Sequence, residues 1–313
     1  AGRERALLGK VGEQAGEELA DYTQSVYRTI LAAGRSYQNA CSGVTSKVYE
    51  TIRKALDTTP DLFPQRATVA CQGVEGAYSQ IACDSIFKAP TVLYFNTFEH
   101  VFKAVESGMC QYGVLPIENS TAGSVNAIYD LMTKHNFSIV RSARLKVSHN
   151  LLCKHGVKKE DIKEIFSHQQ AISQCAGYLS TLKGVKVTVV ENTALAAQMV
   201  AQSERRDVAA LSSRFCGELY GLNLLEQNVQ DQDNNYTRFI CISKNPEIYP
   251  GADRTSLMMT LPHKPGALYN VLSKFYALGI NLRKLESRPL PDREFEFMFY
   301  FDLECSVYAP EME

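Results

Sequence analysis

Residues 113–125 read GVLPIENSTAGSV, an apolar run that stops at a dense group of small polar side chains. The apolar part, 112–117, predicts a strand, and 124–135 has the apolar spacing of a helix. The same alternation predicts strands at 67–72, 91–95, 162–168, 185–191 and 207–213, and helices at 77–87, 97–108, 169–182, 193–203 and 214–221. Alternating strands and helices indicate an α/β fold with a mostly parallel sheet and helices on its faces.

The two flanking segments have different patterns. Residues 17–40 and 43–56 predict helices, and 57–66, with two prolines, predicts a linker, so 1–60 is expected to be all-helical. After a second linker at 243–253, the order strand, helix, strand, strand begins a ferredoxin-like α+β sandwich. The chain ends at Glu313 before a second helix and fourth strand, so we expect one uncovered sheet face and one unpaired edge.

Bulk composition excludes several classes of protein. The formal net charge is -1 over 313 residues, so no electrostatic field favours nucleic acid or an anionic membrane. No apolar stretch approaches the roughly 18 residues of a membrane span. The nine cysteines include no C-x-x-C pair, which indicates reduced thiols and a cytoplasmic location. His149, Cys153 and His155 share one predicted strand face, but without a fourth ligand we predict no metal site.

Polar clusters follow the predicted strands at 73–80, 118–124, 167–171 and 191–194, and a fifth cluster, 231–239, precedes a strand. In open α/β sheets ligands bind beyond the carboxyl ends of strands, where helix N-termini can hold carboxylates. Taken singly, each cluster has another explanation, such as a tight turn at Gly73 and Gly76, helix caps at Ser120 and Thr121, or a structural ion pair at Arg238. Their recurrence at one sheet edge favours a binding site.

Together these motifs resemble prephenate dehydratase. The matching stretches are GVEGAYS (73–79), LPIENSTAGSV (115–125), SHQQA (167–171), ENTALAA (191–197) and NYTRF (235–239). The resemblance covers about 66–313 and implies two subdomains around a cleft, similar to periplasmic binding proteins. The first subdomain would comprise 66–145 and 227–243, and the second 146–226. It would be followed by an ACT regulatory domain at 254–313.

The resemblance also implies a reaction and a site. Prephenate would lose its ring carboxylate and its ring hydroxyl, giving phenylpyruvate, carbon dioxide and water, with no cofactor. Catalysis is then expected from Thr237, as hydrogen-bond donor or acid toward the leaving hydroxyl, together with Asn119 and Ser120. The residues expected to bind substrate are Thr121, Gly76, Ser167, Gln170 and Arg238.

The C-terminal and N-terminal segments carry further resemblances. GALY (266–269) and ESRP (286–289) are similar to the ACT motifs that bind L-phenylalanine between two copies, which implies feedback inhibition and a homodimer or homotetramer. The expected regulatory residues are Gly266, Ala267, Leu268, Asn281, Glu286, Ser287 and Arg288. RERALL (3–8) and ILAAGRSYQ (30–38) resemble the chorismate mutase fused to this dehydratase in many bacteria, with Glu4 and Gln38 at substrate-contacting positions. The helix with the main cationic ligands is absent, so we expect no mutase activity.

Three alternatives remain open at this point. An arogenate dehydratase would act on the amino analogue of prephenate, and sequence separates these two substrates poorly. A solute-binding or effector-binding module shares the fold without the chemistry. An inactive regulatory paralogue is the third alternative.

Overall fold

The computed structural model of the chain describes residues 2–41, 46–290 and 296–309. Its contacts divide the chain into two units, residues 1–57 and 58–313, which we describe separately. The first unit is helical, with α1 (Gly2–Ala15), α2 (Ala20–Cys41) and α3 (Lys47–Thr58). Gly16 has φ +79° and makes the tight turn between α1 and α2, a conformation that glycine adopts without steric cost. No helix among the described residues is long and apolar enough to cross a bilayer.

The first sheet of the larger unit has the strand order β2-β1-β3-β11-β5, with the short β4 paired to β3. Its strands are β1 (Thr68–Gln72), β2 (Thr91–Phe95), β3 (Tyr112–Asn119), β4 (Gly123–Ser124), β5 (Ser138–Lys146) and β11 (Tyr236–Ser243). Helix α4 (Tyr78–Ile86) packs on one face through Ala82 and Cys83. Helices α5 (Phe98–Glu106) and α6 (Asn126–Met132) pack on the other. We call this sheet and its helices the first subdomain.

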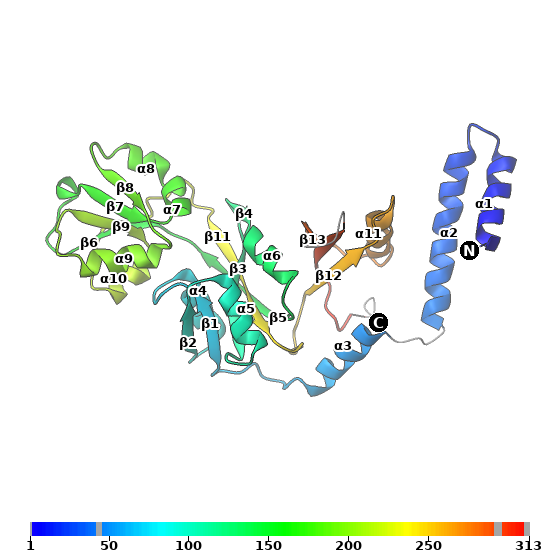
Figure 1. The fold of residues 1–313 in the computed structure, drawn as a ribbon, viewed down its shortest axis with the longest axis horizontal. Coiled ribbons are helices and arrows are strands. Elements are labelled where there is room, and N and C mark those ends of the chain that lie inside the picture. Colours follow the sequence, from blue (N-terminus) through cyan, green and yellow to red (C-terminus); the bar gives the residue numbers. More distant parts are fainter. Residues whose placement is uncertain (1, 42–45, 291–295, 310–313) are drawn as a thin grey trace. The chain divides into compact units, whose positions relative to one another are not determined.

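The second sheet has the order β10-β6-β9-β7-β8. Its strands are β6 (Asn150–Cys153), β7 (Glu164–Ser167), β8 (Lys186–Val189), β9 (Val208–Ser212) and β10 (Asn223–Glu226). Figure 1 shows α7 (Gln169–Gln174) and α8 (Ala176–Ser180) on one face and α9 (Thr193–Gln202) and α10 (Arg214–Leu219) on the other. A short 3-10 turn, η1 (Lys159–Asp161), precedes β7. This sheet and its helices form the second subdomain.

The expectation of a mostly parallel sheet is corrected in one respect. The α/β alternation is present, but it builds two mixed sheets, in each of which two strand pairings are parallel and others antiparallel. In the first sheet β11 runs opposite to its neighbours β3 and β5, and in the second sheet β6 runs opposite to its neighbours β9 and β10. These two strands lie where the chain crosses between the sheets, which it does after β5 and again before β11. The backbone N–H of Val147 on the outward segment donates to the Asn235 carbonyl on the returning one, at 2.8 Å.

The C-terminal sheet has the order β12-β14-β13, with strands β12 (Thr255–Leu261), β13 (Leu282–Pro289) and β14 (Phe297–Leu303). The predicted order strand, helix, strand, strand is confirmed, with α11 (Ala267–Ala277) between β12 and β13. Phe301 and Leu303 of β14 pack beneath α11, since alternate side chains of a strand point to opposite faces.

The sequence led us to expect that the opposite face of this sheet would be uncovered, but in the structure it is covered. Met298 and Tyr300 belong to the same buried cluster as α5 and α6 of the first subdomain. The Tyr300 ring meets the Tyr129 ring edge-on, with centroids 5.3 Å apart. An apolar face is therefore buried against the core of the first subdomain rather than by an additional helix.

Candidate active site

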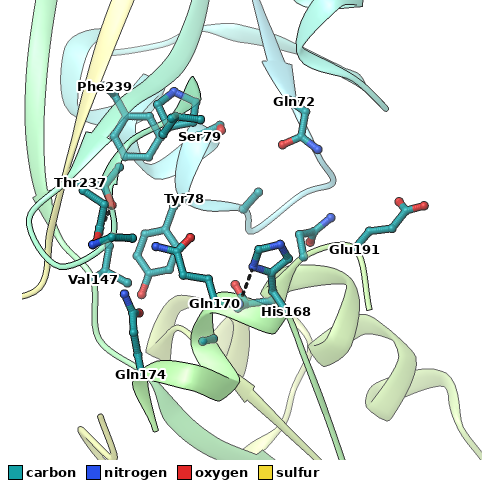
Figure 2. A pocket seen from close by; sticks show the side chains of 18 of the residues that line it. Gln72, Tyr78, Ser79, Val147, His168, Gln170, Gln174, Glu191, Thr237 and Phe239 are labelled. Carbon is teal, nitrogen blue, oxygen red and sulfur yellow. Dashed lines mark hydrogen bonds between the residues drawn. The ribbon is translucent and has the colours of Figure 1, made fainter. Parts of the chain in front are cut away.

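A cavity of about 430 Å³ lies between the two subdomains, within the size range of ligand pockets. Figure 2 shows side chains from both subdomains converging on it, among them Tyr78 and Thr237 from the first and His168 and Gln174 from the second. The first subdomain contributes Gln72, Ala77, Tyr78, Ser79, Phe98, Pro116, Asn119, Ala122, Gly123, Ser124, Val125, Val147, Thr237 and Phe239. The second contributes His149, His168, Gln170, Ala171, Gln174, Glu191, Asn192 and Thr193.

A β-bulge brings Asn119 and Thr237 to the same face of the sheet. In the β3–β11 pairing Phe239 lies opposite Pro116 and Arg238 opposite Glu118, so Ile117 is an extra residue on β3. The bulge reverses the alternation of the side chains that follow it. Asn119, opposite Thr237, consequently faces the cavity, although Ile117 two positions earlier is fully buried in the core.

The hydrogen bonds of Asn119 fix the direction of its amide. Its Oδ1 accepts from the backbone N–H groups of Thr121, at 3.1 Å, and Ala122, at 2.9 Å. Since backbone nitrogens can only donate, Asn119 Nδ2 must face the other way. It donates to Thr237 Oγ1 at 2.9 Å and to Asn235 Oδ1 at 2.8 Å. The Thr237 hydroxyl oxygen therefore accepts, and its own hydrogen has no acceptor among the described residues, which leaves it free to donate into the cavity.

A second set of bonds joins the two subdomains. Gln174 Nε2 on α7 donates to Thr121 Oγ1 at 2.7 Å, and the Thr121 hydroxyl donates to Asn119 Oδ1, also at 2.7 Å. Asn235 Nδ2 donates to Gln174 Oε1 at 2.9 Å. The polar junction after β3 is thus tied to the first helix of the opposite subdomain.

The cavity lining is polar but nearly without charge. Burial lowers the pKa of His149 and of His168 below the ordinary imidazole value, so both rings are neutral at pH 7. Burial raises the pKa of Tyr78 well above its usual range, and its hydroxyl donates to the Ser148 carbonyl at 2.8 Å. Among the lining residues the one carboxylate is Glu191, and there is no lysine or arginine.

Neutral donors are therefore what the cavity offers to a carboxylate. Helix α9 begins at the lining residue Thr193, and Asn192 Oδ1 caps it by accepting from the Leu195 N–H at 2.8 Å. Helix α4 begins at the lining residue Tyr78, with no side-chain cap. Free N–H groups at helix starts favour anionic ligands. Across the described residues there is no cluster of three His, Cys, Asp or Glu side chains that could hold a metal ion.

Of the residues predicted from sequence to act on substrate, Thr237, Asn119 and Gln170 line the cavity. Thr121 lines an adjoining hollow of about 290 Å³ beside Gln170 and Gln174. Ser120 instead joins the segment after β3 to the start of β11, because its hydroxyl donates to the Asn234 carbonyl and accepts from the Tyr236 N–H.

Two other predicted binding residues have structural roles. Ser167 is fully buried and its hydroxyl donates to the Leu211 carbonyl at 2.8 Å. Gly76, at φ +90°, lies where a Cβ would come 3.0 Å from Cys216 Sγ of the second subdomain. Ser167 therefore fixes β7 to β9, and Gly76 permits the close approach of the two subdomains.

Arg238 does not face the cavity, which corrects the expectation that it binds a substrate carboxylate. As the neighbour of Thr237 on β11 it points to the opposite face of the sheet. There it pairs with the fully buried Asp302 of the C-terminal sheet and lies 3.5 Å from Glu118. The alternative weighed from sequence, a structural ion pair, is the one that the structure contains.

The predicted regulatory residues separate into two groups within the single chain. Ala267 and Leu268 line a hollow of about 130 Å³ next to Gly266, which has φ +80°. Glu286 and Arg288 are on the covered face of β13, where they bond Ser124, at 2.6 Å, and Asp130, at 2.7 Å.

The remaining regulatory and N-terminal candidates also have assigned positions. Asn281 Nδ2 donates to Glu304 Oε2 at 2.6 Å. Ser287 is exposed on β13, opposite Phe299 and on the face of the sheet that carries α11. In the helical unit Glu4 pairs with Arg35, and Gln38 is exposed on α2.

Sequence reasoning missed Gln174, His149 and Asn235 as parts of the site. Gln174 lies four residues beyond Gln170 and so on the same helix face, a spacing that pointed to it once Gln170 was chosen. Asn235 stood inside a quoted motif without a role, and His149 was weighed only as a metal ligand.

Comparison with known proteins agrees with this geometry. A family model described as prephenate dehydratase matches residues 69–247, which is more than half of the chain. A curated relative named arogenate dehydratase/prephenate dehydratase 2, chloroplastic, from Arabidopsis thaliana is 39% identical over 254 residues, covering 77% of this chain. The match spans 66% of that relative, slightly under two thirds of its length.

Two solved structures are similar over most of the chain. Prephenate dehydratase from Arthrobacter aurescens, in complex with L-Phe, superimposes with a TM-score of 0.71 at 27% identity, covering 78% of this chain and 82% of that one. A protein described as GqqA, a novel type of quorum quenching acylases, gives a TM-score of 0.70 at 34% identity, covering 78% and 89%. The family model includes β3, β11 and the whole second subdomain, and with it the cavity residues described above; the chain belongs to the prephenate dehydratase family.

Proposed function

We propose that the chain catalyses the decarboxylating dehydration of prephenate to phenylpyruvate. The observation that carries the proposal is the Thr237 hydroxyl, whose oxygen accepts from Asn119 and whose hydrogen is available to the cavity. In the reaction the bond to the ring carboxylate breaks and releases carbon dioxide. Its electron pair completes the aromatic ring and expels the ring hydroxyl, which takes one proton and leaves as water. Thr237 is in position to supply that hydrogen bond or proton. If Thr237 gives up its proton, solvent returns one to the hydroxyl.

The charge of the lining supports a reaction that needs no strong base. A dianion that must lose carbon dioxide is not helped by tight cationic pairing of the leaving carboxylate, since that pairing stabilises the ground state. Neutral donors at the starts of α4 and α9 can orient the carboxylates without it. A threonine acts as an acid only where water is excluded, so the step requires the two subdomains that line the cavity to exclude water during turnover.

Arogenate is the second candidate substrate. It differs from prephenate in carrying an ammonium group in place of the keto oxygen. The Glu191 carboxylate in the lining could pair with the ammonium group of arogenate. Prephenate has no cationic group for it to pair with. The name of the Arabidopsis relative includes both activities.

For the C-terminal segment we propose an ACT regulatory domain that binds L-phenylalanine. The hollow beside Gly266 is lined by Ala267, Leu268, Phe297 and Phe299, which suits an aromatic side chain. The similar structure from Arthrobacter aurescens is a complex with L-Phe. We place the effector between the turns of two copies in a homodimer or homotetramer, with inhibition through a closed arrangement of the subdomains.

For the N-terminal helices we propose a partial chorismate mutase fold without mutase activity. Glu4 is already paired with Arg35, and the described helices bring no further cation to that pair. Conversion of chorismate to prephenate by the purified chain would refute this.

The function is tested by incubating the purified chain with prephenate and following phenylpyruvate by its absorbance in alkali. Arogenate is assayed in parallel by the appearance of phenylalanine. A sample without protein serves as the control, because prephenate also decomposes without enzyme. Turnover of either substrate that exceeds this control supports a dehydratase, and the ratio of the two kcat/KM values identifies the substrate. Rates equal to the control for both would refute the proposal.

A further inference from the structure

His149 closes a hydrogen-bonded network that begins at the backbone after β3. The ring is nearly fully buried at the entry to β6, in the second subdomain, and it lines the cavity. Its Nε2 lies 2.9 Å from Gln174 Oε1, and no described residue partners its Nδ1. The residue takes no part in the reaction as derived above.

The direction of every bond in this network follows from two backbone N–H groups. The N–H groups of Thr121 and Ala122 require Asn119 to present Oδ1 to them, so Asn119 Nδ2 faces Asn235 Oδ1. Asn235 must then donate from Nδ2 to Gln174, and Gln174 must accept with Oε1. A flip of any one of these side-chain amides would bring two donors or two acceptors into contact, and a hydrogen bond would be lost.

This assignment determines the tautomer of His149. Because Gln174 Oε1 can only accept, His149 Nε2 must carry the hydrogen and donate. Nδ1 of the neutral ring then holds a lone pair with no partner among the described residues. The lowered pKa of the buried ring agrees with a neutral imidazole.

The bonds from His149 to Thr237 all run in the same direction. His149 donates to Gln174, and Gln174 donates to Thr121. Thr121 donates to Asn119, and Asn119 donates to Thr237, whose hydroxyl hydrogen is left for the cavity. Hydrogen bonds arranged head to tail polarise one another, so each link strengthens the next. The run begins in the second subdomain and ends in the first, so it is complete only when the two subdomains lie as close as they do here.

We propose that His149, donating from Nε2 to Gln174, is a positioning residue that holds this network in the direction that leaves the Thr237 hydroxyl free to donate to substrate. No proton moves along the network, since its amide links do not exchange protons in turnover. Without the imidazole donor, Gln174 Oε1 keeps one partner, Asn235, and the amide is free to turn away from Thr121. The inference rests on the proposed dehydratase function.

The test compares two substitutions of His149 in the full chain. His149→Phe keeps ring volume and removes the donor, whereas His149→Gln places an amide N–H close to the position of Nε2. We expect kcat to fall about tenfold or more in His149→Phe, the scale of one lost hydrogen bond, with KM changed less than about threefold. His149→Gln should recover kcat to within about threefold of the wild type, a rescue that follows from the donated bond.

A matched control and a double-mutant cycle separate positioning from loss of stability. His135 is also a largely buried histidine with one side-chain bond, to Glu106 at 3.0 Å, and it does not line the cavity. His135→Phe should lower the melting temperature by a similar amount and change kcat less than about twofold. In a Gln174→Leu background, His149→Phe should cost less than about twofold in kcat, because both act through one network.

Nitrogen-15 NMR of the labelled chain reads the tautomer of His149 without any turnover. The expected result is protonated Nε2 and unprotonated Nδ1. Protonated Nδ1, unchanged kcat in His149→Phe, or equal losses in His149→Phe and His149→Gln would each overturn the inference. If the wild type converts neither prephenate nor arogenate while the NMR shows the expected tautomer, the dehydratase proposal fails and the hydrogen-bond assignment stands.

Discussion

Asn119 Nδ2 lies 2.9 Å from Thr237 Oγ1, and the amide donates to the hydroxyl oxygen. The direction is fixed because Asn119 Oδ1 is already engaged by the backbone N–H groups of Thr121 and Ala122. A hydroxyl that accepts from an amide directs its own hydrogen elsewhere, and here that direction is the cavity. The relationship depends on the bulge at Ile117, which places both side chains on one face of the sheet.

Asn119→Asp should abolish most turnover while preserving the fold. The introduced carboxylate keeps both bonds to the backbone N–H groups, but it presents an acceptor to Thr237 where the amide presented a donor. The Thr237 hydrogen would then turn toward this carboxylate and be lost to the substrate. We expect kcat to fall about 100-fold, the scale of one lost acid or oxyanion donor.

Asn136→Asp is the matched control for the added charge. Asn136 is exposed and is not part of the cavity lining, so the kcat of Asn136→Asp should stay within about twofold of the wild-type value. Steady-state kinetics of both variants, with circular dichroism to verify folding, provides the comparison. An Asn119→Asp chain with more than about a third of wild-type kcat would show that the direction of this bond is unimportant.

Asp302→Asn and Arg238→Gln should destabilise the chain and leave substrate binding unchanged. Asp302 is fully buried and pairs with Arg238. Arg238→Gln leaves this buried carboxylate without its cation, and Asp302→Asn leaves Arg238 with only the more distant Glu118, at 3.5 Å. The expected cost is about 3–5 kcal/mol in the free energy of unfolding. Urea denaturation measures this cost, and KM for the substrate should match the wild type in both variants. A raised KM in Arg238→Gln alone would mean that Arg238 contacts substrate after all.

Stability should fall in acid partly because of Glu164. The Thr188 hydroxyl, at 2.7 Å, and the cations Arg205, at 2.6 Å, and Lys186, at 3.0 Å, lower the pKa of Glu164 to about 2. Because the folded pKa is depressed, the unfolded chain binds the proton first. The contribution is therefore complete above about pH 5 and is lost between about pH 5 and pH 2.

Glu164→Gln isolates this contribution. At pH 7 the variant should unfold at lower urea than the wild type, and the difference should shrink steadily as the pH is lowered. Urea midpoints at a series of pH values measure it. A difference that is constant over this pH range would mean that Glu164 does not titrate as described.

L-Phenylalanine should bind at the hollow beside Gly266. Ala267→Phe fills that hollow, which is about 130 Å³, and should abolish the heat of binding in isothermal titration. Ala277→Phe makes the same change at the exposed far end of α11 and should bind as the wild type does. Equal binding by both variants would show that L-phenylalanine does not bind in this hollow.

The alternation of strands and helices was readable from the sequence because each buried element has its own period. Strands β1, β2 and β3 were predicted from apolar runs, and α5 from apolar steps of three and four. Strand β5 was not predicted, because it reads SIVRSARLK and several of its side chains face solvent. Whether neighbouring strands run parallel or antiparallel depends on where the chain crosses between sheets, which no local pattern encodes.

Part of the site was predictable for a similar reason. Thr237 and Arg238 are consecutive on a strand, so alternation alone would have allowed only one of them to face the cavity. The bulge at Ile117 was not predictable, since it is defined by the pairing of β3 with β11, a strand far later in the chain. The bonds of Gln174 to Thr121 and Asn235 were likewise unpredictable, because they join segments that meet only after both subdomains have folded.

The central claim is that the Thr237 hydroxyl donates to the departing hydroxyl of the substrate. The most direct measurement compares kcat for the wild type, Thr237→Val and Thr237→Ser on the preferred substrate, with melting temperatures recorded alongside. Valine keeps the shape and removes the hydroxyl, whereas serine keeps the hydroxyl. The account predicts a fall of about 100-fold or more for Thr237→Val and a kcat within about tenfold of the wild type for Thr237→Ser. A folded Thr237→Val chain that retains more than about a tenth of wild-type kcat would contradict it.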